Sequence, residues 1–104
     1  MPTFLVISRH SPENCWRFNE KARKMHLDLA NKFETLLKRH GVRQLGCWFV
    51  PSEHLLIEVF ESPTLEAFQK FVMEPEIDRW TAYNTMEIKL ATSLEEAMRM
   101  LKTK

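Results

Sequence analysis

Two ionisable side chains, His10 and Glu58, stand at the end of or inside apolar segments of the sequence. Glu58 interrupts the run LLIEVF, and a carboxylate there must be paired, solvated by a cavity or shifted toward its neutral form. His10 follows TFLVIS and offers hydrogen bonding to a ligand, proton transfer or metal ligation. If the two segments are neighbouring strands, the two side chains share a face and could form a general base. The alternatives are a histidine bonded to loop backbone and a glutamate that reaches solvent or Lys89.

The thiol of Cys15 lies in SRHSPENCW, close to an expected helix start. The helix dipole there favours a nucleophilic thiolate, which makes Cys15 a candidate reactive thiol. Cys15 also falls on the apolar stripe of the expected helix, so a buried structural cysteine is the other interpretation. Cys47, in LGCWFV, is interpreted as a core residue. Because the cysteines and histidines show no CxxC or paired-histidine spacing, we expect no metal site.

Three aromatic residues offer walls for a flat organic ligand. They are Trp48, Trp80 and Tyr83, and a pocket with apolar walls and a few polar groups is typical of small-molecule sites. Core or dimer packing explains the same residues equally well. The candidate ligand-binding residues are therefore His10, Glu58, Trp48, Trp80 and Tyr83.

The element that follows His10 is expected to be a long helix. Ser11 is a predicted N-cap and Pro12 suits the first helical position, and the helix runs to about Arg39 and stops at Gly41. Such a helix is far longer than the preceding strand. Either a short leading helix bends near Asn19, or the first turns project beyond the sheet to cover a cavity or a second subunit.

The apolar periodicity of the segments after this helix predicts the rest of the fold. The segments VRQLGCWFV and LLIEVFES flank PSEH as a hairpin, a second helix follows and breaks near Glu74, and NTMEIKLA alternates as a fourth strand before a last helix. This order predicts a ferredoxin-like βαββαβ fold of class α+β, with a four-stranded antiparallel sheet and a C-terminal helix, in one domain over residues 1–104. Its strands carry apolar residues on both faces although helices cover one, so we expect a homodimer that buries the free face.

Composition limits the partners. The 104 residues carry a net charge of +1, which provides no strong field for nucleic acid or an anionic membrane. The strand LLIEVFES lacks the glycine-aromatic signature of RNA-binding domains with this topology. The first apolar segment is too short for a membrane span and has no cationic leader. We therefore expect a cytoplasmic protein that binds neither nucleic acid nor membranes.

Several strings, namely RHSPENC, FNEKARKM, PSEHL and SPTLEAFQKF followed by MEPEI, resemble a group of small uncharacterised prokaryotic proteins. That group belongs to the dimeric α+β-barrel superfamily, which includes haem-degrading and quinone-forming monooxygenases, small decyclases and ligand sensors. The resemblance implies the fold and the dimer. It leaves the cofactor and the activity unidentified.

Three functions follow as hypotheses. The first is a homodimer that binds or senses a small molecule in a cavity on the helix-free face of the sheet. The second is a small monooxygenase-like enzyme in which His10 and Glu58 handle protons and Trp80 shapes the pocket. The third is a purely structural dimerisation module.

Overall fold

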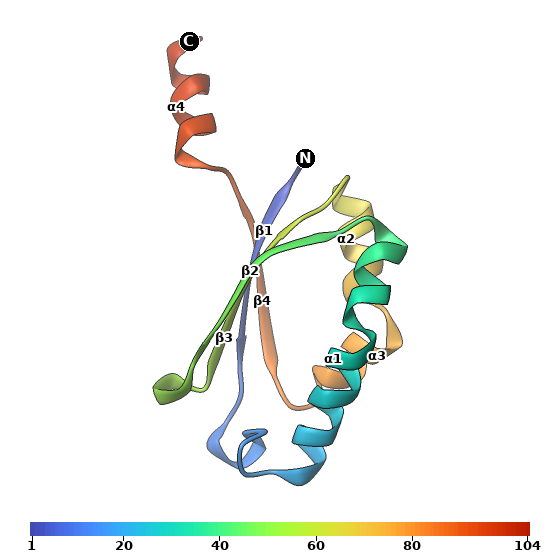
Figure 1. The fold of residues 1–104 in the computed structure, drawn as a ribbon. Helices are drawn as coiled ribbons and strands as arrows, with labels where there is room; N and C mark the ends of the chain where they lie inside the picture. The colour runs from blue at the N-terminus through green and yellow to red at the C-terminus, as the bar shows by residue number, and fades with distance from the viewer.

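The computed structural model describes residues 1–104, and it contains one antiparallel sheet with helices on one face (Figure 1). The elements in chain order are β1 (Thr3–Arg9), the 3₁₀ turn η1 (Pro12–Asn14), α1 (Glu20–His40), β2 (Arg43–Val50), the 3₁₀ turn η2 (Pro51–Glu53), β3 (Leu55–Glu61), α2 (Leu65–Val72), α3 (Pro75–Trp80), β4 (Thr85–Ala91) and α4 (Leu94–Lys102). The predicted ferredoxin-like α+β fold is confirmed.

The sheet has the strand order β2-β3-β1-β4, with β1 antiparallel to both β3 and β4. Val6 of β1 lies directly opposite Glu58 of β3, and side chains directly opposite one another in an antiparallel pair share a face. Val6 is buried under the helices. The register therefore directs Glu58 toward the helix layer.

Helix α1 begins later than the sequence predicts. Ser11 makes no capping hydrogen bond, and the turn after it ends at Cys15, whose backbone is extended. The true N-cap is Asn19, whose Oδ1 accepts a hydrogen bond from the Ala22 amide at 3.0 Å. The continuous helix from residue 12 is therefore wrong, and the break near Asn19 is the alternative that the structure contains. The predicted end is confirmed, since Gly41 has a φ of 67° in the left-handed region.

Phenylalanine rings fill one end of the space between the sheet and the helices. Phe4 stacks on Phe68 with ring centroids 4.2 Å apart, and Phe60 packs within 5.7 Å of both Phe68 and Phe71. All four side chains are at most 3% exposed. This end of the layer is a close-packed core.

Helix α4 stands away from the sheet and from the other helices (Figure 1). Its apolar residues are exposed, with Leu94 at 76% and Leu101 at 60%. The chain is correspondingly elongated, with a radius of gyration of 15.3 Å, whereas a compact domain of about 100 residues has about 13 Å. No helix in the structure combines the length and the hydropathy that a membrane span requires.

Candidate functional site

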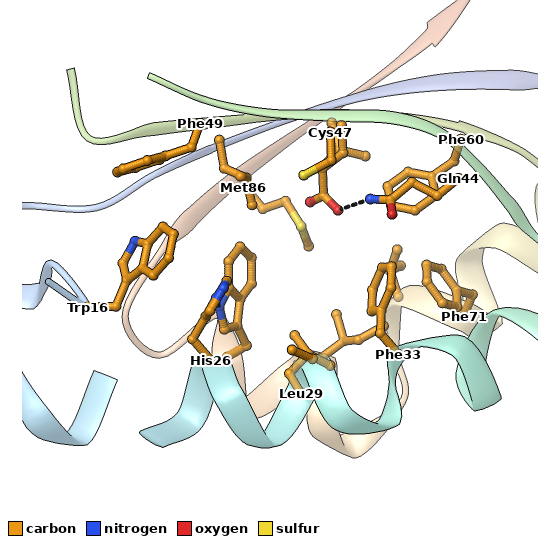
Figure 2. A pocket seen from close by; sticks show the side chains of 17 residues that line it. Trp16, His26, Leu29, Phe33, Gln44, Cys47, Phe49, Phe60, Phe71 and Met86 are labelled. Atoms are coloured by element: carbon orange, nitrogen blue, oxygen red, sulfur yellow. Dashed lines mark hydrogen bonds between the residues drawn. The ribbon is translucent and has the colours of Figure 1, made fainter. Parts of the chain in front are cut away.

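A pocket of about 410 Å³ lies between the sheet and helices α1 to α3. Figure 2 shows Gln44, Cys47 and Phe49 on the sheet side, facing His26 and Phe33 across the space. Seventeen residues line it, and its three residues outside the hydrophobic set are Glu58, Gln44 and His26. The fourteen hydrophobic residues are Val6, Trp16, Leu29, Ala30, Phe33, Cys47, Phe49, Leu56, Phe60, Phe71, Val72, Ile77, Trp80 and Met86.

Glu58 is the acidic group of the pocket. Its side chain comes from the centre of β3 and is 9% exposed. Burial raises the pKa of Glu58 to about 7, and the Gln44 amide, which donates to Oε2 at 2.8 Å, opposes that rise (Figure 2). Because the pKa lies near neutral pH, both protonation states are populated there. Glu58 can therefore give or accept a proton at an apolar site.

His26 is the basic group of the pocket. It stands on α1, where its ring stacks on Trp16 with centroids 4.2 Å apart. Burial, followed by the nearby His10, lowers the pKa of His26. The Trp80 indole donates from Nε1 to Nδ1 of His26 at 3.3 Å, so the neutral ring carries its proton on Nε2. His26 thus adds a neutral hydrogen-bond donor to the pocket.

The structure places the five predicted ligand-binding residues in four different environments. Glu58 and Trp80 line the pocket. His10 stacks on the pocket residue Phe49 with centroids 6.4 Å apart, so it lies on the same side of the sheet but outside the lining, and no hydrogen bond joins it to Glu58. Trp48 is 57% exposed on the opposite face of the sheet, and Tyr83 is half-buried in the turn between α3 and β4.

The pocket lies on the face of the sheet opposite to the one expected. Glu58 is paired with Val6, under the helices, whereas Trp48 is paired with Ile57 on the helix-free face. Alternation along a strand separates two faces but does not say which one meets the helices. The predicted location of a cavity on the helix-free face is therefore corrected to the helix-covered face.

Of the lining, only Glu58 and Trp80 were predicted as ligand-binding residues, and those missed include Trp16, His26 and Gln44. His26 precedes Leu29 by three positions and Phe33 by seven, a spacing that places it on the apolar face of α1. That signal was present in the sequence. Gln44 reaches the pocket where the ladder between β2 and β3 shifts register before Gly46, and no periodic pattern indicates such a shift.

The environment of Cys47 differs from its prediction, and that of Cys15 agrees with one of its two interpretations. Cys15 is completely buried, as the structural interpretation holds, but it follows η1 and not the first turn of an α-helix. Cys47 was expected in the core and instead lines the pocket with an exposed side chain. Partial burial and then Glu58 raise the pKa of Cys47 to about 11. Cys47 is therefore a neutral thiol at physiological pH.

A second cluster of polar side chains lies beside the pocket. Cys15 Sγ and one ring nitrogen each of His10 and His54 lie within 4.8 Å of one another. The sequence spacing predicted no metal site, because these residues come from separate turns of the chain. The fold brings them together where β1 ends and β3 begins.

Comparisons with known proteins identify the family of this chain and proteins that share its fold. The sequence model of a family described as "Domain of unknown function (DUF3303)" matches residues 3–104. No curated protein matches this sequence.

Several solved structures share the fold at low sequence identity. An antibiotic biosynthesis monooxygenase is 12% identical with a TM-score of 0.62, and the match covers 90% of this chain and 99% of that one. An uncharacterised NIPSNAP domain protein from Burkholderia xenovorans is 10% identical with a TM-score of 0.54, covering 90% and 97%. A dimeric ferredoxin-like protein from an uncultured marine organism is 14% identical with a TM-score of 0.54, covering 89% and 96%. Identities this low establish the fold alone.

Proposed function

Since this chain belongs to the DUF3303 family, whose description assigns no activity, we propose its function from the pocket: it binds a small, flat, mostly apolar molecule that carries a hydroxyl or amine group. The observation that carries this proposal is Glu58, held at a pKa of about 7 inside an apolar pocket of about 410 Å³. The volume falls within the range of about 300 to 1,000 Å³ typical of ligand sites.

The walls and the polar groups of the pocket have different roles. Aromatic rings such as Trp16, Phe49 and Trp80 provide flat apolar contact area. Glu58 accepts a hydrogen bond in its ionised form, and His26 offers its Nε2–H as a donor. A few fixed polar groups in an apolar pocket orient a ligand and select for its functional group. The arrangement therefore favours an aromatic alcohol or amine over a plain hydrocarbon.

A matched pair of probes tests this proposal. In a Trp48→Phe variant, Trp16 and Trp80 remain as fluorescent reporters at the pocket, and we expect 2-naphthol to quench them with about tenfold higher affinity than naphthalene. Naphthol affinity should rise as the pH passes through about 7, because the ionised Glu58 is the better acceptor. Glu58→Gln should remove that pH dependence. Glu61→Gln, on the same strand but the other face, is the control, and equal affinities for the two probes would overturn the proposal.

The oligomeric state is a second part of the proposal, in which two copies pack through the helix-free face. Leu5 and Ile7 of β1 face Val59 and Ile57 of β3 there, and all four side chains are only half-buried in the single chain. Beside them the Trp48 indole lies so close over Gly46 that a Cβ would collide with the ring. An apolar face of this kind favours a partner, and the dimeric ferredoxin-like neighbour supports a second copy.

Light scattering tests the dimer. We expect a mass of twice 12.4 kDa, and Trp48→Glu should shift it toward one chain because a charge buried in the interface lacks a partner. Phe18→Glu is the matched control, since Phe18 is also an exposed aromatic residue but lies in the loop before α1. A wild-type protein that stays a single chain at micromolar concentration would contradict this part of the proposal.

A monooxygenase-like activity is the second candidate function. The antibiotic biosynthesis monooxygenase shares the fold, and Glu58 is suited to removing a proton from a bound hydroxyl group. Oxygen uptake with naphthol as substrate, lost in Glu58→Gln, would favour the enzyme. Binding without uptake favours the ligand sensor, and the absence of both favours the structural dimerisation module.

The predicted cytoplasmic location is supported by the thiols. Cys15 and Cys47 are both free, and they lie in different environments, one fully buried and one at the pocket. Free thiols persist in reducing compartments. Fractionation of cells that express the full-length protein tests the location.

A further inference from the structure

Three metal-ligating side chains meet at the corner next to the pocket. His10 follows β1, Cys15 follows η1, and His54 connects η2 to β3. Their donor atoms lie within 4.8 Å of one another. Nε2 of His10 and Nδ1 of His54 are buried and have no hydrogen-bond partner. Buried polar atoms are almost always paired in folded proteins, so an unpaired ring nitrogen on each histidine of this cluster needs an explanation.

The surroundings hold the three donors in place. The His10 amide donates to the His54 carbonyl at 3.2 Å, which joins the two turns, and the Arg17 guanidinium donates from Nε to Cys15 Sγ at 3.3 Å. The His10 ring packs against the rings of Trp16 and Phe49. Such contacts fix the orientation of ligating side chains.

The backbone of His54 has an uncommon conformation. His54 has a φ of 51° and a ψ of 47°, and it is the only residue besides glycine with a positive φ. Side chains other than glycine adopt this region seldom, and residues that do so concentrate at binding and active sites. The left-handed turn brings His54 back toward the end of β1.

We propose that His10, Cys15 and His54 bind a Zn²⁺ ion. One thiolate and two imidazoles form a donor set that zinc favours, whereas the lack of a carboxylate disfavours Mg²⁺ and Ca²⁺. Binding releases the thiol proton to solvent, and the sulfur keeps lone pairs for both the metal and Arg17. Tetrahedral Zn–S and Zn–N bonds separate neighbouring donors by about 3.5 Å, so the three side chains need only a small inward movement. Three protein ligands leave a fourth position for water or another ligand.

This inference is independent of the pocket's proposed function. The rings of Trp16 and Phe49 line the pocket and also pack on His10, so the cluster lies behind the pocket wall. The ion would tie together the end of β1, the loop before α1 and the hairpin between β2 and β3. We therefore expect binding to raise thermal stability whether or not the pocket is filled.

The test uses untagged full-length protein, fully reduced, with Zn²⁺ and Co²⁺ as probes. We expect one Zn²⁺ per chain by competition with a chromophoric chelator, an increase in melting temperature, and thiolate-to-metal charge-transfer absorption with Co²⁺. Cys15→Ser should abolish that absorption, and Cys47→Ser should retain it. His10→Gln and His54→Asn should each weaken Zn²⁺ binding by about tenfold or more, and His40→Gln should leave it unchanged.

The chosen variants distinguish loss of a zinc ligand from loss of the fold. Asn tolerates the left-handed backbone at position 54, so loss of binding in His54→Asn reports on the imidazole and not on the turn. If Cys15→Ser does not fold, His10→Gln and His54→Asn decide the question. Equal Zn²⁺ affinity of the wild type and these two variants, or no Zn²⁺ binding by the folded wild type, overturns the proposal.

Discussion

The two ends of the space between the sheet and the helices are built from the same strands but are filled differently. At one end Phe4 and Phe68 stack at 4.2 Å within a cluster of buried rings. At the other end the side chains leave about 410 Å³ open around Glu58. Dispersion contacts are lost wherever a core is hollow, so the packed end must stabilise the layer that contains the pocket.

The two ends also shift the pKa of a carboxylate in opposite directions. Near the packed end, Glu74 accepts hydrogen bonds from His40 at 2.8 Å and from Arg39 at 2.7 Å, and these two partners, His40 first, lower the pKa of Glu74. In the pocket, Glu58 has a neutral amide as its partner, and burial raises its pKa to about 7. A cationic partner keeps a carboxylate ionised at neutral pH, whereas an apolar wall leaves it able to exchange a proton there.

Truncating the packed end should have the largest effect. Phe68→Ala is expected to lower the free energy of unfolding by about 3–5 kcal/mol, because the ring is 1% exposed and its removal leaves a cavity. Met86→Ala, in the wall of the existing pocket, should lower it by less than half as much. Urea denaturation measures both values. Equal losses would mean that the two ends are equally well packed.

Glu58 should make the protein less stable as the pH rises, which is the opposite of the usual effect of a carboxylate. Its pKa rises from 4.5 in the unfolded chain to about 7 in the fold, so the folded state binds the proton more tightly. As far as this group is concerned, stability is therefore greatest below pH 4.5, and it falls by about 3 kcal/mol as the pH rises from 4.5 through 7. Glu58→Gln should flatten this fall in urea melts at pH 5 and pH 8.

The control for that measurement is Glu61→Gln. Glu61 lies on the same strand as Glu58 but on the helix-free face, where Arg43 Nη1 donates to it at 3.3 Å. Its replacement should leave the loss of stability between pH 5 and pH 8 in place. If Glu58→Gln shows the same slope as the wild type, the buried carboxyl does not titrate near neutral pH.

Changes at the N-cap of α1, the helix whose middle turns line the pocket, should have a smaller effect on stability. Asn19→Ala should lower the free energy of unfolding by about 1 kcal/mol, because it removes the acceptor for the Ala22 amide. Ser11→Ala should change it by less than about 0.5 kcal/mol, since Ser11 caps no helix. Denaturant melts of the two variants show which residue caps the helix. A larger loss of stability for Ser11→Ala than for Asn19→Ala would mean that Ser11 is the cap, as the sequence predicted.

Glu74→Gln should have the smallest effect and the opposite pH dependence to Glu58→Gln. The lowered pKa of Glu74 means that its contribution is present above pH 4.5 and is lost as the pH falls through the folded value. Thermal melts should show the variant below the wild type at pH 7, with the two converging in acid. A difference that persists at pH 3 would show that the loss is one of packing and not of ionisation.

The sequence by itself determined the order of the elements and the residues that break their patterns. Alternating apolar residues define the strands, Gly41 ends α1 in the left-handed conformation, and Glu58 is conspicuous in an apolar strand. These signals are local, because backbone preference and side-chain periodicity act over a few neighbouring residues. Trp80 was also recognised as a pocket candidate, because a large aromatic residue carries the same apolar area wherever it lies.

Only the tertiary structure decided which face of the sheet holds the pocket and which polar groups meet. The pairing of Val6 with Glu58 sets the face, and the approach of Gln44 to Glu58 depends on the register of β2 against β3. The cluster of His10, Cys15 and His54 joins turns that lie on either side of α1 and β2 in the chain. Distances between such segments follow from strand register and helix packing, which involve the whole chain at once, and no spacing along the sequence contains them.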